Sequence, residues 1–594
     1  MRRSFKVLLS SFTAIAIASP ALAQSNTAPA LQYAKQGWTA DDRQTFYTTS
    51  QGSHIIRYLW FKALRRLDVD EPFAGDQLAR YGYLPNDKSR SNPEGLPVGF
   101  VIDGNVGSGD LGMSCAACHT GQIEYRKDGV IQRLRIDGAP AMADFQAFLK
   151  DLTEVTSATL NDDGRFDKFA HAVLGNRYSA TRAKDLKAEF GKWVDQWTAF
   201  MNKSLPTSPW GPGRLDAFGM IFNRVAGKDL KIDANFQVAD APVSYPFLWN
   251  AAHQDKTQWN GGVPNGLNIH ALGRNTGEVF GVFAEFGPVP VINLPGVPPL
   301  IDYGKNSVNF GNLQQLEEKI AALQPPPWPF ALDQALVEKG RVLFEAHCSK
   351  GCHEQTESKD VPGAWLTPVL PAGTDPKMFE NADRSSKSGL LEGALIPNTP
   401  GLVLAETAKT HDILANAVVG SLINDALPFA KLPNLKSGVF LAVQKDLPIL
   451  LNRPQNAPLS ALLKNPAVIA TLRSQIERRF TNMYKSPNND ASAAYETRVL
   501  KGIWATAPYL HNGSVPNLWE LLLPPERRST SFMIGSRTYD EKNVGYVTTE
   551  SPFKYGTLTV GQGAQPGNSN AGHDYSRDMT DDDRWALLEY LKQL

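Results

Sequence analysis

Apolar residues recur at helical spacing in the first third of the chain. The pattern i, i+3, i+4, i+7 predicts an amphipathic helix and is formed by Phe145, Phe148, Leu149 and Leu152. The same spacing predicts another helix through Trp193, Trp197 and Phe200. The apolar run at residues 55–61 predicts a partly buried helix. No period of about 20–50 residues recurs, so a solenoid is not expected.

Two later helices are indicated by their start signals. Asp333 is a good N-cap residue, and the helix that it begins should run through Gly340 and Phe344. Near the end of the chain, Thr580 is followed three residues later by an acid and then by apolar residues. This is close to a capping box, so we expect a closing helix to start near residue 581.

Prolines are frequent at residues 288–329, between the earlier and the later predicted helices, and this stretch ends in Pro-Pro-Pro-Trp-Pro. Proline lacks a backbone donor and fixes its own torsion, so we expect no helix interior there. We interpret the stretch as a domain linker, with residues 325–332 at its centre.

The first residues have the layout of a secretory signal peptide. A basic start precedes an apolar run at residues 7–18 and a small-residue sequence at residues 21–23. The apolar run is shorter than the roughly 20 residues that a membrane-spanning helix needs, and no later stretch qualifies. We therefore predict a signal peptide at residues 1–23, no membrane span, and a periplasmic or secreted protein.

Composition narrows the class of protein further. Sixty basic and sixty acidic residues cancel, which gives no electrostatic signature for binding nucleic acid or an anionic membrane. The 48 glycines and 41 prolines predict many long loops. The chain has only four cysteines, and they form two close pairs that are each followed directly by histidine.

The first pair is a C-x-x-C-H sequence, the attachment pattern of c-type haem, formed by Cys115, Cys118 and His119. Two thiols must reach the two vinyl groups on one porphyrin edge while the adjacent imidazole reaches the iron, and a short turn running into a helix would allow both. A disulfide loop, a zinc half-site and a thiol redox motif are the alternatives. Zinc would need two such halves to converge, and a redox motif usually lies beside a βαβ pattern, which is absent here.

The second pair, Cys348 and Cys352 with His353, has one more residue between its thiols. Its surroundings favour haem, because the upstream helix with Gly340 and the closing helix with Tyr590 resemble the two helices that cross in cytochrome c domains. Gly351 also gives the longer loop conformational freedom.

The segment at residues 503–516, Ile-Trp-Ala-Thr-Ala-Pro-Tyr-Leu-His-Asn-Gly-Ser-Val-Pro, and the order of motif, linker, motif and closing helix resemble the di-haem cytochrome c peroxidase superfamily. The branch with di-haem rubber oxygenases and fatty-acid dioxygenases is the most similar. The resemblance implies that His511 ligates the second haem opposite His353. In the peroxidase branch a methionine takes that role, and Met533 is the nearest candidate.

The resemblance also implies that the segment around Trp259, Arg274 and Glu278 borders the distal pocket of the first haem. A carboxylate and an arginine beside an open iron suit peroxide chemistry, because one moves a proton and the other stabilises charge. An aromatic wall at Trp259 suits a hydrophobic substrate. The alternative is that Arg274 and Glu278 form a structural ion pair and that Trp259 belongs to the core.

The expected architecture is mainly α-helical with long loops: two cytochrome c-like haem domains plus an N-terminal extension. The expected parts are the signal peptide (1–23), the extension (24–107), the first haem domain (108–324), the linker (325–332) and the second haem domain (333–594). The expected cofactors are two covalent haem c groups, with calcium left open. We expect a haem oxidoreductase that uses peroxide with a small electron-donor protein, or dioxygen with an unsaturated hydrophobic substrate such as polyisoprene or a fatty acid. A non-enzymatic electron carrier is the third hypothesis.

Overall fold

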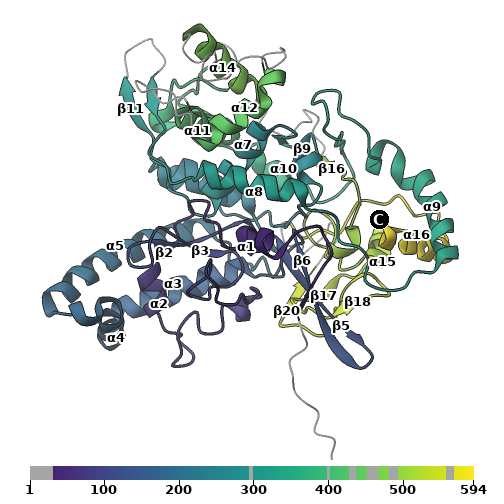
Figure 1. Cartoon of the computed structure of the whole chain (residues 1–594), viewed down its shortest axis with the longest axis horizontal. Coiled ribbons are helices and arrows are strands. Elements are labelled where there is room, and N and C mark those ends of the chain that lie inside the picture. The colour runs from purple at the N-terminus through teal and green to yellow at the C-terminus, as the bar shows by residue number, and fades with distance from the viewer. Residues whose placement is uncertain are drawn as a thin grey trace, which may run out of the picture.

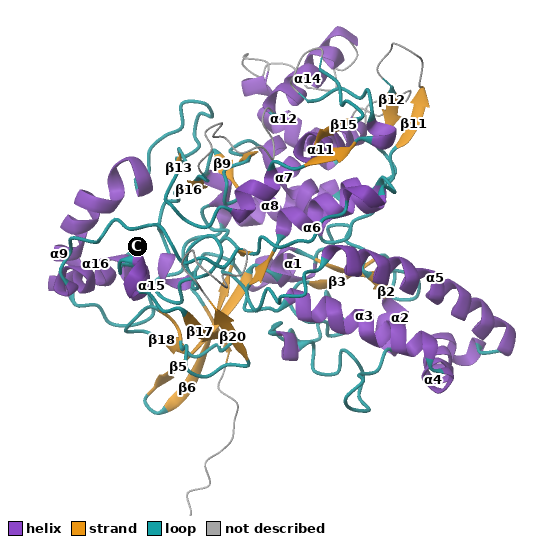
Figure 2. Cartoon of the chain, turned by 180° about the vertical axis from the view of Figure 1, so that it is seen from behind, coloured by secondary structure: helices purple, strands orange, loops and turns teal. Residues whose placement is uncertain are grey.

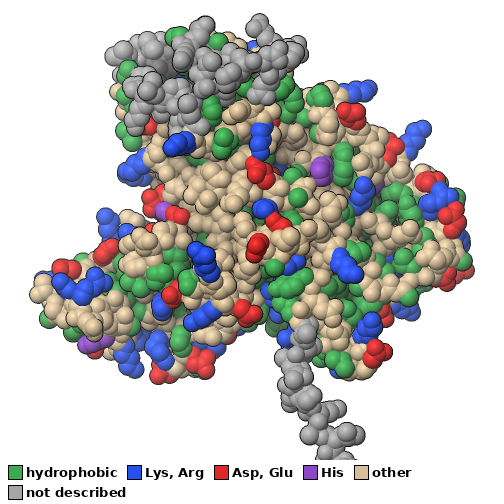
Figure 3. Space-filling view, in the orientation of Figure 1, with side chains coloured by type: hydrophobic (Ala, Val, Ile, Leu, Met, Phe, Trp, Pro, Cys, Tyr) green, Lys and Arg blue, Asp and Glu red, His purple; other side chains and the backbone are tan. Residues whose placement is uncertain are grey.

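The computed structural model of the 594-residue chain describes residues 31–292, 299–397, 402–426, 436–450, 466–480, 493–556 and 567–594. Helices make up 43% and strands 16%, which confirms the predominance of helix. The predicted signal peptide lies outside the described residues. Within the described part, no helix is long and apolar enough to span a bilayer. Figure 3 shows basic and acidic side chains interspersed over the visible face, as the balanced charge predicts.

A first group of helices extends to one side of the molecule (Figure 1). It comprises α2 (Tyr58–Ala63), α3 (Phe145–Asn161), α4 (Asp163–Leu174) and α5 (Ala180–Ser204), whereas α1 (Ala40–Thr48) lies near the centre of the view and contacts α8. The two helices predicted from apolar spacing are α3 and α5, which pack together and share a buried core. Their N-caps are Asp144 and Ser179, whose side chains accept backbone hydrogen bonds from the first turn.

The chain also forms two three-stranded sheets, of which β2-β4-β3 adjoins α2 and β1-β6-β5 lies beside the C-terminal strand β18. Their strands are β1 (Leu31–Tyr33), β2 (Ile56–Arg57), β3 (Phe100–Asp103), β4 (Asp110–Met113), β5 (Thr120–Lys127) and β6 (Val130–Asp137). The run at residues 55–61 was expected to be one helix. It divides into β2 and α2 instead, because Ile56 pairs with Leu111 of β4.

A second group of helices surrounds a core in the middle of the chain. It comprises α6 (Ala217–Phe222), α7 (Asn268–Gly281), α8 (Phe310–Ala322), α10 (Lys377–Ala382), α11 (Thr410–Ala426), α12 (Gly438–Leu450) and α14 (Pro466–Arg479). Short strand pairs connect its loops: β7 (Arg214–Leu215) with β8 (Val243–Ser244), β9 (Lys256–Thr257) with β10 (Val263–Pro264), β11 (Val289–Ile292) with β12 (Leu300–Asp302), β13 (Val369–Leu370) with β16 (Tyr495–Glu496), and β14 (Ser385–Lys387) with β15 (Thr407–Lys409).

The proline-rich stretch is therefore not a linker throughout. Helix α8 lies inside it, because no proline occurs between Pro299 and Pro325. Phe310, Leu313 and Leu316 of α8 are buried. Residues 323–333 hold no helix or strand, as expected of the stretch around residues 325–332.

The C-terminal group contains the crossing helices that the sequence predicts (Figure 2). Helix α9 (Gln334–Phe344) starts after the N-cap Asp333, and α16 (Asp581–Gln593) starts with a capping box at Thr580. A Cβ on Gly340 would overlap the carbonyl of Ala586, so glycine permits the crossing. The remaining elements are α15 (Leu518–Leu521), β17 (Ser531–Ile534) with β20 (Phe553–Gly556), and β18 (Tyr539–Asp540) with β19 (Gly545–Tyr546).

Candidate haem sites

The second cysteine motif follows directly on α9. The chain leaves the helix through a turn at Glu345–His353, in which Lys350 and Gly351 have non-helical torsions. Gly351 has φ of +77°, in the left-handed region that suits glycine. The extra residue between Cys348 and Cys352 is thus accommodated by a glycine turn, in agreement with the expectation.

His353 is oriented by its Nδ1 atom, which lies 2.7 Å from the carbonyl oxygen of Arg498. A carbonyl can only accept, so Nδ1 carries the hydrogen and Nε2 keeps its lone pair. Burial lowers the pKa of His353, which favours the neutral imidazole. This arrangement is typical of a metal-bound histidine, whose second nitrogen donates to a backbone carbonyl.

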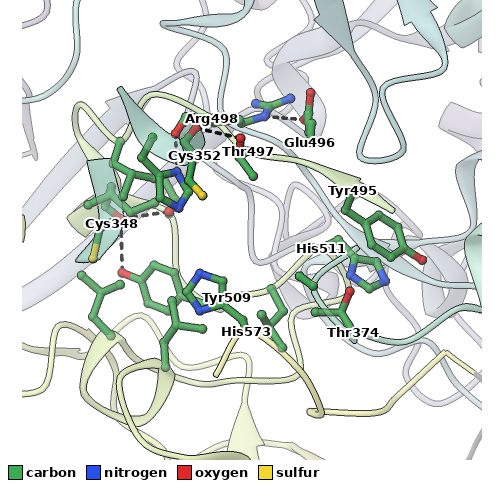
Figure 4. Close-up of a pocket in the computed structure, with 18 of the residues that line it drawn as sticks. Cys348, Cys352, Thr374, Tyr495, Glu496, Thr497, Arg498, Tyr509, His511 and His573 are labelled. Atoms are coloured by element: carbon green, nitrogen blue, oxygen red, sulfur yellow. Dashed lines mark hydrogen bonds and ion pairs between the residues drawn. The ribbon is translucent and has the colours of Figure 1, made fainter. Parts of the chain in front are cut away.

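A cavity opens beside this motif and contains both of its cysteines (Figure 4). We call it the second cavity. Its empty volume is about 1360 Å³, including the part open to solvent. Both thiols of the motif and His353 border this one space, as a haem held by the motif would require. Most of the lining is apolar, and four histidines line it: His347, His353, His511 and His573.

His511 lies in the second cavity, where Figure 4 shows it beside Tyr495. The two rings stack with centres 3.9 Å apart. The backbone carbonyl of His511 accepts a 2.8 Å bond from the amide of Ser244. Burial lowers the pKa of His511 to about 3, so the ring is neutral and able to ligate. The ligand role that the resemblance implies for it stays a prediction.

His573 is a second candidate that sequence reasoning missed. Its ring centre lies 6.4 Å from that of His353. Two imidazoles on opposite sides of one metal hold their ring centres about 6 Å apart, since each metal–nitrogen bond is about 2 Å long. Its Nδ1 is buried and bonds to none of the described residues, and burial lowers its pKa to about 3. Met533, on β17, is absent from the lining of the second cavity.

From this ring separation we expect His573→Ala to convert a six-coordinate low-spin second haem into a high-spin or water-ligated one. Loss of a strong-field imidazole changes the spin state whatever happens to the fold. His511→Ala is the matched variant: it should keep the low-spin spectrum if His573 is the ligand and lose it if His511 is. Absorption and electron paramagnetic resonance spectra distinguish the two. The reverse result would support His511 as the ligand.

The first cysteine motif lies on a tight turn between two strands. Cys115–Ala117 forms a single 3-10 turn after β4, and β5 starts directly after His119. The expectation that a helix follows is wrong here, because Thr120 pairs with Asp137 of the neighbouring strand β6. The Nδ1 atom of His119 lies 2.8 Å from the carbonyl oxygen of Pro246, and burial lowers the pKa of His119 to about 4. Both motif histidines are thus oriented in the same way.

A first cavity adjoins this motif, with an empty volume of about 1160 Å³ including its open part. It is lined by Cys115, Cys118 and His119 and also by the predicted residues Trp259, Arg274 and Glu278. The structure therefore brings these six together. Arg274 and Glu278 both belong to α7, one helical turn apart.

Arg274 and Glu278 have separate partners in the first cavity. Arg274 forms a buried ion pair of 2.5 Å with Glu317 of α8. Glu278 accepts a 2.8 Å bond from the side chain of Gln258, and burial raises its pKa. Gln258 has φ of +66°, which is uncommon for a residue with a side chain. Sequence reasoning missed Gln258 and Glu317 as members of this site, because no motif marks either residue.

Trp259 lies between the two cavities and lines both of them. Its indole nitrogen donates a 2.8 Å bond to the carbonyl of Ser244, which also lines both. The sequence-based hypothesis made Trp259 an aromatic wall for a substrate. The structure places it in the wall that the two cavities share, and its role towards a substrate stays a prediction.

The alternatives to haem attachment do not fit the four thiols. All four cysteines are free, so neither pair forms a disulfide. The two pairs line different cavities and do not converge on one zinc ion. Burial raises the pKa of Cys118 to about 12 and of Cys348 to about 11, which disfavours a thiolate redox centre. Among the described residues, no cluster of acidic, histidine or cysteine side chains is able to hold a metal, so the structure identifies no calcium site there.

Comparison with known proteins also supports haem binding. Residues 494–533 match a family model described as RoxA-like, cytochrome c-like. An uncharacterized protein of Sinorhizobium fredii, y4iJ, is 29% identical over 94% of this chain and 92% of its own length. A second uncharacterized protein of that organism, y4iM, is 38% identical over 58% of this chain and 59% of its own length. Neither description assigns an activity.

The cytochrome c-like match covers one side of the second cavity, including Tyr495, Arg498 and His511. It indicates a haem c protein of the oxidoreductase class. Residues 494–533 are thus similar to the RoxA-like cytochrome family. The finer resemblance to di-haem peroxidases stays a prediction.

Proposed function

We propose that the protein is an exported di-haem c-type cytochrome, similar to cytochrome c peroxidases, that activates peroxide or dioxygen at the first haem. Cys115, Cys118 and His119 would hold that haem, and Cys348, Cys352 and His353 the other. The difference between the cavities carries the proposal. Among the described residues, four histidines line the second cavity, whereas His119 is the only one in the lining of the first. An iron without a strong second ligand can bind a small oxidant.

The polar side of the first cavity supports acid–base chemistry. When bound, haem supplies an iron centre that activates oxygen species. Glu278 can hold or move a proton, because burial keeps its pKa above the usual range. Gln258 keeps the Glu278 carboxyl in place through the 2.8 Å bond. Arg274 adds a fixed positive charge, and its pairing with Glu317 prevents it from swinging away.

The second cavity suits electron transfer. His353 and a second histidine of its lining would hold the iron, which would leave no position for substrate and favour outer-sphere exchange with a small donor protein. Five residues line both cavities, with Trp259 among them, so the two cavities share a wall. Electrons from the donor would therefore reach the first haem across this wall.

A dioxygenase acting on an unsaturated hydrophobic substrate, such as polyisoprene or a fatty acid, is the second candidate. The apolar side of the first cavity favours it, with lining residues Phe145, Leu215, Met220, Ile221, Val243 and Ile320. The RoxA-like match supports the same class of haem protein. A carrier without enzymatic activity is the third candidate and would require a ligand such as Met220, a thioether in that lining.

Ligand binding and turnover together test these candidates. For either enzyme, cyanide should bind one haem and leave the other unchanged. Peroxide turnover with a reduced donor is then compared with oxygen uptake in the presence of an unsaturated lipid or polyisoprene. Cyanide refused by both irons in every redox state would leave only the carrier. Oxygen uptake without peroxide turnover would favour the dioxygenase.

A further inference from the structure

The wall between the two cavities contains a buried arginine that contacts both sides. Five residues line both cavities and form what we call the shared wall: Ser244, Tyr245, Phe247, Trp259 and Arg498. Arg498 is 5% exposed. It carries the only full charge among these five side chains.

Arg498 is linked to both motif histidines: to His353 by a direct hydrogen bond, and to His119 through the peptide unit that joins Pro246 and Phe247. Its backbone carbonyl accepts the 2.7 Å bond from Nδ1 of His353. Its side-chain Nη1 donates a 3.1 Å bond to the carbonyl of Phe247. The preceding carbonyl, that of Pro246, accepts the 2.8 Å bond from Nδ1 of His119. One residue thus takes part in orienting the imidazoles of both sites.

The charged end of Arg498 is held in a fixed position. Its Nε lies 2.5 Å from the carboxylate of Glu496, which is buried and accepts a further bond from Gln254. The guanidinium carbon lies 5.1 Å from the ring centre of Phe247 and 5.2 Å from that of Trp259. A positive charge in a buried wall acts on both cavities with little screening by solvent.

We propose that Arg498 is a positioning residue that sets the reduction potentials of both haems together. It helps to orient the two motif imidazoles and places one positive charge in the wall between the cavities that would hold the haems. Ligand orientation, hydrogen bonding to the axial histidine and local charge are the means by which a protein tunes a haem potential. The inference rests on the proposed function only in that each cavity must hold a haem.

Arg498→Met is expected to lower both midpoint potentials, because removing a positive charge stabilises the more positive, oxidised form of each haem. The expected change is at least tenfold in each reduction equilibrium, equal to 59 mV for one electron. Glu496→Gln should act in the opposite direction and raise both midpoints, because it leaves the arginine charge uncompensated. The rise should be larger at the second haem, since Glu496 lines that cavity alone. Arg498→Lys keeps the charge and should return both midpoints towards the wild-type values.

The measurement is a spectroelectrochemical titration of the purified two-haem protein, followed at the absorbance of each haem. Arg224→Met is the matched control: Arg224 is also 5% exposed, lies 3.5 Å from Asp229 and bonds a backbone carbonyl, but lines neither cavity. It should leave both midpoints unchanged. If the Arg498→Met variant does not retain both haems, the midpoint potentials of the Glu496→Gln variant alone test the inference.

Two outcomes would overturn the inference: midpoints that shift at only one haem or at neither, and an equal shift in the Arg224 control. Loosened packing cannot shift the midpoint potentials in opposite directions in the Arg498 and Glu496 variants, because its effect does not depend on the sign of the charge removed. A wild-type mass with fewer than two haems would instead contradict the proposed function, before any variant is compared.

Discussion

Replacing Cys115 and Cys118 together by alanine is expected to remove one haem and abolish activity, while the second haem stays attached. Both thiols line the first cavity, where Glu278 and Arg274 also lie, so the change removes the covalent anchors of the reactive site alone. Mass spectrometry should show the wild-type protein heavier than its polypeptide by two haems and the variant heavier by one.

The complementary variant, with Cys348 and Cys352 replaced by alanine, serves as the control. It should lose the other haem and retain cyanide binding at the first site. A wild-type mass with one haem would mean that the longer spacing around Gly351 does not attach haem. Full activity in the Cys115 and Cys118 variant would show that the first haem is not the reactive one.

Glu278→Gln is expected to reduce peroxide turnover by about 10²–10⁴-fold, the usual contribution of a positioned acid–base group. Glutamine keeps the size of the side chain and its place beside Gln258 but cannot release or take up the proton. Steady-state rates with hydrogen peroxide and a reduced donor measure the effect, and the haem spectra should stay unchanged.

Glu589→Gln is a suitable control for the Glu278 variant. Glu589 is buried, at 8% exposure, and lines neither cavity. Its replacement should leave turnover within the scatter of the wild type. If Glu278→Gln keeps peroxide turnover and oxygen uptake with the apolar substrate unchanged, Glu278 is structural and the peroxidase mechanism is wrong.

Much of the helical framework could be predicted, because it depends on local signals. Apolar spacing predicted α3 and α5, and N-caps at Asp333 and Thr580 predicted where α9 and α16 begin. The prediction failed where strand pairing decided the conformation. Ile56 pairs with Leu111, far along the chain, and Thr120 pairs with Asp137 across the hairpin of β5 and β6, which overrode the helix expected around each residue.

The residues of the candidate sites were likewise predicted only in part from the sequence. The cysteine motifs identified both cavities, and the resemblance led to Trp259, Arg274 and Glu278, which all line the first one. His573 and Glu317 carry no motif, and their relevance depends on a ring separation and an ion pair that only folding creates. Likewise, nothing in the residues around Trp259 indicates that it faces two cavities instead of one.

By itself, the sequence predicted the two cysteine–histidine motifs as haem sites and determined the helices with strong caps. These follow from spacing and capping, which are properties of neighbouring residues. The tertiary structure alone decided the shared wall and the partners of Arg274, Glu278 and Arg498. Residues 244–247, 259 and 496–498 are far apart in the chain and meet there. Such contacts depend on how whole elements pack, and no local pattern encodes them.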